Sequence, residues 1–332
     1  MYQPKRASRS EFVPIRNLRY HVRTWGEPAP GKVPLVMVHG WMDVAASYQF
    51  VVDAFAREHY VIAPDWRGYG LTGLAGPPQE AERPLGGQRP HEVGSLGAMS
   101  LPPADNYWFP DYLADLDFLL DHYAADAPVD LVGHSMGGNV AMLYAGSRPE
   151  RIRSLVNLEG FGMAATRPAQ APGRYAKWMN ELKAFHRGEL ALKSYDGVEG
   201  VARRLMKTNK RLTQDKAGWL AQHWARREAD GQWRILGDAA HKIVNANLFR
   251  VDEVLELYRA IRAPVLAVEA SDDSLGQWWQ GRYTLAEYHE RLKAIADLRI
   301  GRIDDAGHML HHDQPEALAK LIEAFLPLGE NP

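Results

Sequence analysis

The sequence predicts an α/β protein with a mostly parallel sheet that is covered by helices on both faces. Three observations support this class. Short apolar runs alternate with segments of helical spacing towards both ends of the chain. Several runs contain no polar residue, as is typical of strands buried on both faces. One run passes through a glycine-rich turn directly into a helix, which is a strand–turn–helix pattern.

The expected strands are apolar runs of four to eight residues, and the expected helices show apolar positions on one side. The strands cover residues 18–25, 34–38, 60–63, 129–132, 152–158, 264–268 and 298–303. The helices cover residues 47–57, 109–123, 136–147, 285–296 and 315–325.

Two segments interrupt this alternation. Residues 71–105 are rich in glycine and proline and are expected to form an irregular loop inserted in the core, either functional or a tolerated surface insertion. Residues 160–250 are helical in character and rich in aromatic side chains, which either pack among themselves or face a substrate. The α/β core would then comprise residues 1–159 and 251–332.

Composition narrows the classes of function. The 332 residues carry a formal net charge of −2, so no global field favours nucleic acid or an anionic membrane. The absence of cysteine excludes disulfides, thiolate nucleophiles and cysteine-ligated metals. No apolar stretch approaches the roughly 18–20 residues of a membrane span, and no secretory signal pattern is present. A cytoplasmic protein is expected, and its oligomeric state is open.

The central motif is Gly133-His-Ser135-Met136-Gly137, between an apolar run and a helix. A sharp turn at this point lifts the Ser135 hydroxyl above the sheet and aims the first helical N–H groups at a bound group. Side chains at positions 133 and 137 would clash with the neighbouring strand and helix. Ser135 is therefore the predicted nucleophile.

A serine hydroxyl needs a general base. His308 follows a strand and a small-residue turn, where it can reach across to Ser135, whereas His311 and His312 lie closer to the next helix. The spacing of these histidines and Asp313 also suggests metal ligands, but Pro315 indicates that the helix begins only there. We expect no metal and no cofactor.

The base in turn needs a carboxylate that orients it. Asp272 and Asp273 follow the 264–268 strand, where catalytic groups gather in such sheets, and the order Ser, Asp, His suits this type of hydrolase. Glu159, after the 152–158 strand, is a further possible acid. Asp273 is preferred, with Asp272 and Glu159 as alternatives.

Acyl transfer also needs donors for an oxyanion. The N–H of Met136 is one candidate, and the N–H of Trp41, after the 34–38 strand, is the other. Gly40 would let this backbone come close to a substrate. His39 precedes the turn and is expected to be a structural hydrogen-bonding residue rather than a second base.

Taken together, five motifs resemble the α/β-hydrolase superfamily over the whole chain: HGW at 39–41, DWRGYG at 65–70, GHSMGG at 133–138, PVLAVEASDD at 264–273 and AGHMLHHDQPEALAKLIEAF at 306–325. The resemblance implies an eight-stranded, mostly parallel sheet with a helical cap domain at 160–250. In the family the acid lies three residues after a glycine; Ala270 occupies that position here, which selects Asp273.

Within this superfamily, dehalogenases and epoxide hydrolases carry Asp where this chain has Ser135, so the resemblance disfavours both chemistries. It implies a cofactor-independent hydrolase of small-molecule carboxylic esters. The alternatives are a C–C hydrolase of the meta-cleavage type and a cofactor-free haloperoxidase or perhydrolase. A non-catalytic small-molecule receptor is more remote, because the set of catalytic residues is complete.

Overall fold

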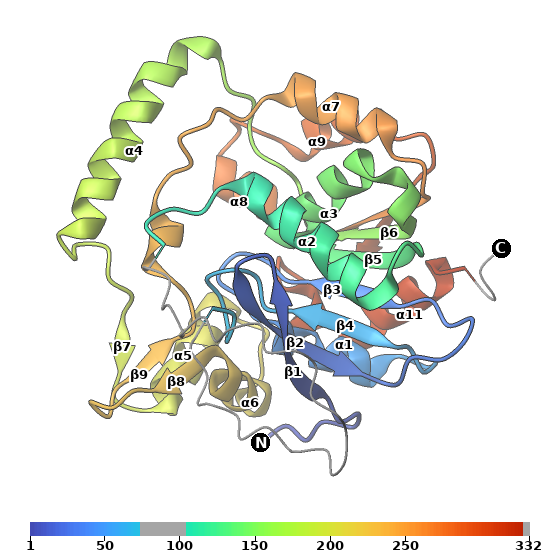
Figure 1. Ribbon diagram of the computed structural model, residues 1–332, viewed down its shortest axis with the longest axis horizontal. Helices are drawn as coiled ribbons and strands as arrows, with labels where there is room; N and C mark the ends of the chain where they lie inside the picture. The colour runs from blue at the N-terminus through green and yellow to red at the C-terminus, as the bar shows by residue number, and fades with distance from the viewer. Residues whose placement is uncertain (74–103, 328–332) are drawn as a thin grey trace, which may run out of the picture.

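An eight-stranded sheet forms the centre of the molecule in the computed structural model, which describes residues 1–73 and 104–327 (Figure 1). Its strand order is β1-β2-β4-β3-β5-β6-β10-β11. The strands are β1 (Arg9–Ile15), β2 (Leu18–Trp25), β3 (Leu35–Val38), β4 (Val61–Pro64), β5 (Val129–His134), β6 (Ile152–Leu158), β10 (Val265–Ala270) and β11 (Leu298–Ile303). The loop expected at 71–105 falls mostly on residues 74–103, outside the described residues.

The sheet is mostly parallel, which confirms the predicted fold class. Every pair from β4 across to β11 is parallel, whereas β1 pairs antiparallel with β2 and β2 pairs antiparallel with β4. Sequence analysis missed β1 because it is a half-exposed edge strand in which only Val13 and Ile15 are buried. Its polar residues hide the apolar pattern on which strand prediction depends.

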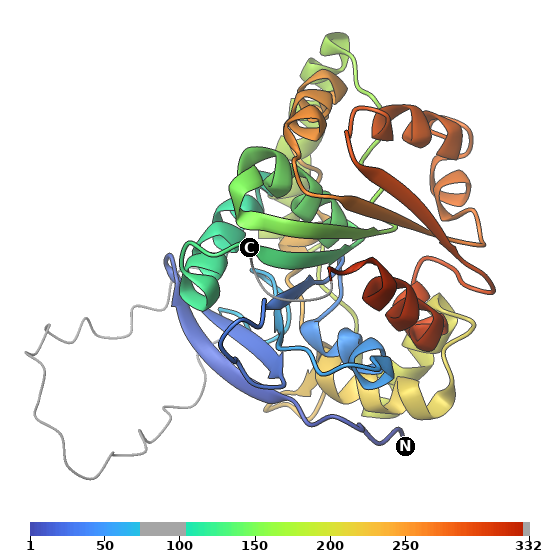
Figure 2. The same ribbon diagram turned by 90° about the vertical axis from the view of Figure 1, so that its right-hand side faces the viewer.

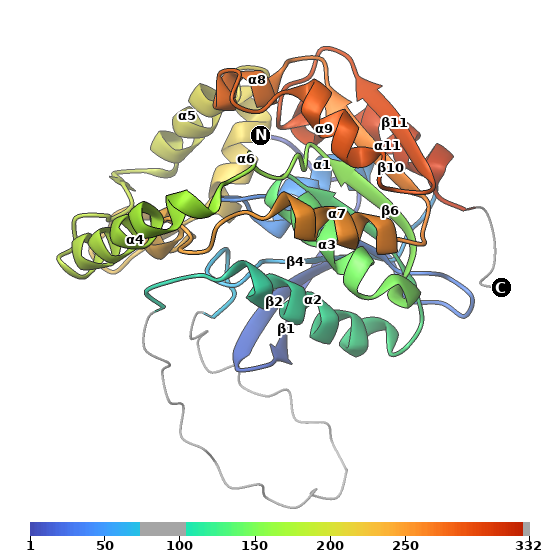
Figure 3. The ribbon, with the colours of Figure 1, turned by 90° about the horizontal axis from the view of Figure 1, so that it is seen from above.

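Helices cover both faces of the sheet (Figure 2, Figure 3). On one face, α2 (Phe109–Ala124), α3 (Met136–Ser147), α7 (Val251–Ala260) and α9 (Leu285–Leu292) contribute to one apolar core. On the other face, α1 (Gln49–Ala54), α10 (Leu310–Asp313) and α11 (Pro315–Phe325) contribute to a second. Among the described residues, no helix is both long and apolar enough to cross a membrane.

Residues 160–250, here called the insertion, contribute no strand to the large sheet within the described chain. The insertion contains α4 (Ala171–His186), α5 (Val198–Thr208) and α6 (Gln214–Trp224). It also contains a small sheet of order β7-β9-β8, formed by Ser194–Tyr195, Trp233–Ile235 and Ala225–Arg227. Sequence analysis expected only its helices, because strands of two or three residues are too short to show a period.

The insertion contacts the core unevenly. Trp219 and Leu220 of α6 share an apolar cluster with Val44 and Phe50 of the core. Helix α4, by contrast, has no buried residue and extends away from the body (Figure 1). The α5–α6 part is therefore packed on the core by apolar burial, whereas α4 is not.

Candidate active site

The carboxyl ends of β3 and β5 meet at the point where the sheet changes direction. Strand β3 lies between β4 and β5, so the chain leaves it towards one side and returns on the other. Ligands of open α/β sheets bind at such switch points, outside the carboxyl ends of the strands. The loops that begin at His39 and at Ser135 both start here.

Ser135 occupies a strained turn between β5 and α3. Its backbone has φ 52° and ψ −114°, an unfavourable conformation for a residue with a side chain. A Cβ atom at Gly133 would overlap the Gly137 carbonyl, and one at Gly137 would overlap the Val38 carbonyl. The two glycines therefore let the turn close, and the turn presents Ser135 half-buried at the end of the sheet.

His308 lies against Ser135, in the loop between β11 and α10. Its Nε2 is 2.9 Å from Ser135 Oγ, within hydrogen-bond reach of a base and its nucleophile. The His308 side chain is 20% exposed, so reagents can approach the pair. His311 and His312 are fully buried in α10, and neither has a hydrogen bond to Ser135.

Glu159 is the carboxylate beside His308. Its Oε2 lies 3.3 Å from His308 Nδ1, and its Oε1 accepts a hydrogen bond of 2.7 Å from the Ala270 N–H. The residue follows β6 directly, is 3% exposed, and has a φ of 54°. Strained backbone of this kind concentrates at functional sites.

The structure shows no hydrogen bond between the preferred acid, Asp273, and His308. Asp273 is exposed, and its Oδ1 accepts a hydrogen bond of 2.7 Å from the Gly276 N–H, which caps the short helix α8 (Ser274–Trp279). Asp272, the other aspartate, pairs with Arg211 at 2.7 Å. Of the three candidate carboxylates, Glu159 is the one that contacts His308, whereas Asp273 caps α8 and Asp272 pairs with Arg211.

The expected oxyanion donors flank Ser135. Met136 is the first residue of α3, and the first N–H groups of a helix have no partner within it. A Cβ atom at Gly40 would lie 3.1 Å from Ser135 Cβ, so the backbone leading to Trp41 runs directly beside the nucleophile. The Trp41 side chain itself is 53% exposed.

His39 is a buried structural residue, as expected. Its Nε2 accepts a hydrogen bond of 2.9 Å from the Trp66 N–H, so Nδ1 carries the proton and donates at 2.8 Å to the Gly40 carbonyl. Burial lowers the pKa of His39, which keeps the ring neutral. Both nitrogens serve the backbone, which holds the loop before Trp41 in place.

Trp278 is a site residue that sequence analysis missed. Its ring meets the His308 ring edge to face, at 4.3 Å between centroids and an interplanar angle of 84°. The side chain is 49% exposed, so it forms an open aromatic wall next to the base. The sequence Gln-Trp-Trp gave no signal, since the approach of α8 to His308 depends on the tertiary fold and not on a local pattern.

The grouping considered for a metal, His308 to Asp313, does not come together. Asp313 accepts hydrogen bonds from the Gly307 N–H and from Asn209 Nδ2, at 2.9 and 2.6 Å. His311 instead faces Asp43, with Nε2 3.6 Å from Oδ2. The short helix α10 begins before Pro315 and turns these side chains in different directions.

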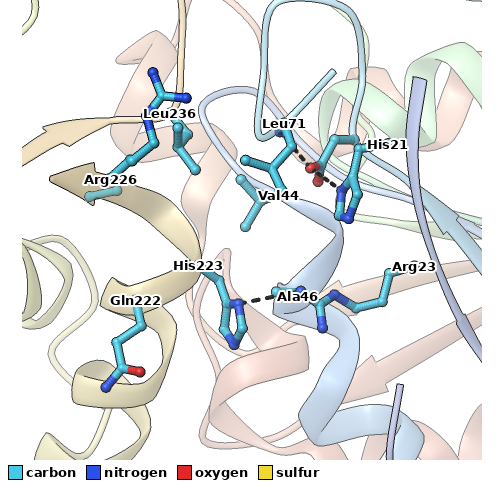
Figure 4. A pocket seen from close by; sticks show the side chains of 11 residues that line it. His21, Arg23, Val44, Ala46, Leu71, Gln222, His223, Arg226 and Leu236 are labelled. Atoms are coloured by element: carbon cyan, nitrogen blue, oxygen red, sulfur yellow. Dashed lines mark hydrogen bonds and ion pairs between the residues drawn. The ribbon is translucent and has the colours of Figure 1, made fainter. Parts of the chain in front are cut away.

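A cavity of about 140 Å³ lies elsewhere, between β2 and the α6–β8 part of the insertion (Figure 4). Arg23 and His223 face each other across it, with 3.3 Å between Arg23 Nη2 and His223 Nδ1. Burial, followed by the charge of Arg23, lowers the pKa of His223 to about 4. Neither Ser135, His308 nor Glu159 lines this cavity, so it is separate from the catalytic candidates.

Known proteins resemble this chain in sequence and in fold. A serine hydrolase-like protein of Danio rerio is 27% identical over 330 residues, covering 97% of this chain and 89% of the relative. A 2-hydroxy-6-oxo-2,4-heptadienoate hydrolase of Pseudomonas putida is 31% identical over 134 residues, covering 40% of this chain and 38% of the relative. The thioesterase domain from the curacin biosynthetic pathway shares the fold, with a TM-score of 0.74, 21% identity and coverage of 96% and 99%. The family model described as the alpha/beta hydrolase fold matches residues 33–315, and the chain belongs to this family.

Proposed function

We propose that the protein hydrolyses carboxylic esters of small molecules through an acyl-enzyme intermediate on Ser135. The observation that carries the proposal is the contact series from Ser135 Oγ to His308 Nε2 at 2.9 Å and from His308 Nδ1 to Glu159 Oε2 at 3.3 Å. A nucleophile, a base and an orienting acid in this order are the requirements for activating a serine hydroxyl.

In the acylation step, His308 Nε2 accepts the proton of Ser135 as Oγ attacks the ester carbonyl. Glu159 accepts the Nδ1–H hydrogen bond, which fixes the tautomer and stabilises the imidazolium as it forms. The N–H groups of Trp41 and Met136 donate to the oxyanion. The imidazolium then returns its proton to the leaving alkoxide, and the alcohol departs.

In the deacylation step, His308 removes a proton from water, and the resulting hydroxide equivalent attacks the acyl carbon. The same two N–H groups hold the second oxyanion. His308 then protonates Ser135 Oγ as the acid product leaves. Every proton passes through His308 Nε2, so His308 serves as the acid and the base of both steps.

We also propose that the insertion acts as the cap of this site. It follows β6 and Glu159 directly in the chain and packs on the core next to the loop that carries Trp41. The open rings of Trp41 and Trp278 favour an ester with a flat or aromatic group. We keep the division into a core at 1–159 and 251–332 and a cap at 160–250.

Labelling and kinetics test the proposal. Wild-type protein should react with a fluorophosphonate probe and hydrolyse p-nitrophenyl esters, and peptide mapping should place the label on Ser135. The Ser135→Ala variant should not take up the label, and its kcat should be about 10⁵–10⁶-fold lower than that of wild type. An unlabelled wild type, or an active Ser135→Ala variant, would rule out this mechanism.

A second candidate is hydrolysis of a C–C bond next to a ketone. The partial match to the Pseudomonas putida heptadienoate hydrolase favours it, and the same serine and histidine would serve the reaction. A ring-cleavage dienoate assayed beside the ester panel separates the two. A kcat/KM for the dienoate well above that for every ester would select C–C hydrolysis.

A further inference from the structure

Three polar side chains form a buried group beneath the Ser135–His308 pair. These residues, here called the polar cluster, are Asp43, His134 and His311, with exposures of 3%, 2% and 0%. Asp43 follows β3, His134 ends β5, and His311 follows β11. One oxygen or nitrogen of each lies within 4.8 Å of those of the other two. Each of the three loops that build the candidate site therefore sends one residue into the same buried position.

His134 connects this cluster to the base. Its Nε2–H donates a hydrogen bond of 2.8 Å to the backbone carbonyl of His308. Burial, reinforced by His311 and His308, lowers the pKa of His134 well below its ordinary value, so the ring is neutral. A neutral ring with its proton on Nε2 has a lone pair on Nδ1, which lies close to Gly40 and accepts no hydrogen bond from the described residues. The residue before the nucleophile is thus bonded to the backbone of the residue that serves as base.

Asp43 and His311 connect the other loops. Asp43 Oδ1 accepts from the Val44 N–H at 2.8 Å and from the Ser47 hydroxyl, which fixes the turn after Trp41. Its Oδ2 faces His311 Nε2 at 3.6 Å, and the rings of His311 and His134 are 4.3 Å apart between centroids. Burial alone would raise the pKa of Asp43, but His311 and Ser47 outweigh it and leave that pKa lowered.

We infer that His134 is a positioning residue whose Nε2–H holds the backbone of His308 at the distance that catalysis by Ser135 requires. This inference rests on the proposed function. Asp43 and His311 pack beside the His134 ring, so side chains from the oxyanion loop, the nucleophile turn and the histidine loop meet at one buried point. The effect on rate is large, because a misplacement of about 1 Å costs on the order of 10²-fold.

The same cluster offers three metal ligands among the described residues, and a bound zinc ion is the competing interpretation. Structural zinc sites use four protein ligands, whereas this cluster offers three. Hydrogen bonding explains the orientation of His134 without an ion. We therefore argue for positioning and make zinc an outcome of the test.

The test uses two variants of similar shape. His134→Gln keeps an N–H donor near the Nε2 position, whereas His134→Met fills the same volume without one. The His134→Met variant should have a kcat about 30–100-fold below that of wild type, with KM changed by less than about twofold. The His134→Gln variant should have a kcat within about fivefold of wild type. Thermal unfolding of both variants shows whether each is folded. Equal losses in Gln and Met, or a Met variant with wild-type kcat, would overturn the inference.

Two further measurements keep this result apart from the proposed function. If wild-type protein neither hydrolyses esters nor takes the fluorophosphonate label, the ester proposal fails on its own. Nitrogen-15 NMR of the histidine rings then still tests the inference, because His134 should be neutral with its proton on Nε2. One equivalent of zinc in purified wild-type protein, absent from both variants, would overturn the inference that His134 acts through its hydrogen bond. It would show that the polar cluster is a metal site.

Discussion

Two neighbouring strands of the sheet end in carboxylates, and the two ends have opposite surroundings. At the end of β6, Glu159 is buried, bonded to the Ala270 N–H and 3.3 Å from His308 Nδ1. At the end of β10, Asp272 is half-buried and pairs with Arg211. Asp273 is exposed and accepts a hydrogen bond from the Gly276 N–H. Only the first end has a carboxylate oxygen directed at the base.

The difference follows from the strand order. Strand β6 pairs directly with β5, which carries Ser135, whereas β10 is one strand further away. The Ser135 N–H even donates to the Leu158 carbonyl at 2.8 Å, so Glu159 begins next to the nucleophile. A glutamate at this position has the length to reach His308. The comparison teaches that adjacency to the nucleophile strand can decide the acid where motif register points elsewhere.

The end of β10 contributes to the site in another way. Asp273 caps α8, and α8 presents Trp278 edge-on to the His308 ring. The position that the family resemblance assigns to the acid thus begins a helix that supplies an aromatic wall. Both strand ends therefore contact His308, β6 through the Glu159 carboxylate and β10 through the Trp278 ring of α8.

Among changes at the two strand ends, replacing the buried carboxylate should have the largest effect. Glu159→Gln keeps the shape but removes the charge and presents an amide to His308 Nδ1, which favours the wrong tautomer. We expect kcat for p-nitrophenyl esters to fall by about 10³–10⁴, as expected for loss of a triad acid.

Asp273→Asn is the matched control at the other strand end. Like Glu159→Gln, it replaces a carboxylate by an amide of the same shape. Its kcat should stay within about threefold of wild type. The opposite pattern, an inactive Asp273→Asn and an active Glu159→Gln, would return the acid to β10.

Shortening the acid should have the next largest effect. Glu159→Asp keeps the charge but withdraws the carboxylate by one methylene from the 3.3 Å contact with His308 and from the Ala270 N–H. A displacement of about 1 Å costs up to roughly 10²-fold, so we expect kcat to fall by about 10–100-fold. Equal activity of Glu159→Asp and wild type would show that the length of the side chain at position 159 does not matter for catalysis.

The sequence was sufficient for the fold because the buried strands carry their own signal. The expected bounds of the buried strand 152–158, and of the helices 136–147 and 315–325, are those of the structure. The edge strand β1 and the short strands of the insertion were missed, since half-exposed or two-residue strands show no apolar run. Register between strands also lay beyond the sequence, because pairing depends on contacts far apart in the chain.

The site was predictable to a different degree at each residue. Ser135 and His308 stand in local patterns, a glycine turn and a strand end, and the structure brings them to 2.9 Å. Choosing among three carboxylates required knowing which strand borders β5, and no local pattern contains that. The polar cluster was hidden for the same reason, as Asp43, His134 and His311 are far apart in sequence.

Removing the cap at Asp273 should affect stability more than rate. Asp273→Ala loses the bond to the Gly276 N–H, and loss of such a cap costs about 1 kcal/mol. For a chain of this size we expect a fall in Tm of about 2 °C. Asp273→Ser keeps a capping oxygen and should restore the Tm. A loss of Tm in both variants alike would mean that the cap does not stabilise α8.

The smallest effect should come from Asp272, whose pair with Arg211 is open to solvent, with side-chain exposures of 38% and 33%. Exposed ion pairs contribute about 0.5 kcal/mol or less, and Arg211 keeps a second partner in Asp305 at 3.1 Å. Asp272→Asn should therefore leave kcat unchanged. Urea titrations at about 0.01 M salt should show a small loss of unfolding free energy that disappears at about 1 M, where the screening length is about 3 Å.

The contribution of the Asp272–Arg211 pair to the free energy of unfolding should depend on pH in a defined direction. Arg211 lowers the pKa of Asp272 below the ordinary 3.8, so the folded protein holds this carboxylate charged more readily than the unfolded chain does. The contribution to stability is therefore present above the ordinary pKa and is lost as the pH falls through the lowered pKa. Wild type and Asp272→Asn should converge in unfolding free energy on acidification. A tenfold loss of kcat in Asp272→Asn at neutral pH would instead bring the end of β10 into the chemistry and erase the contrast with β6.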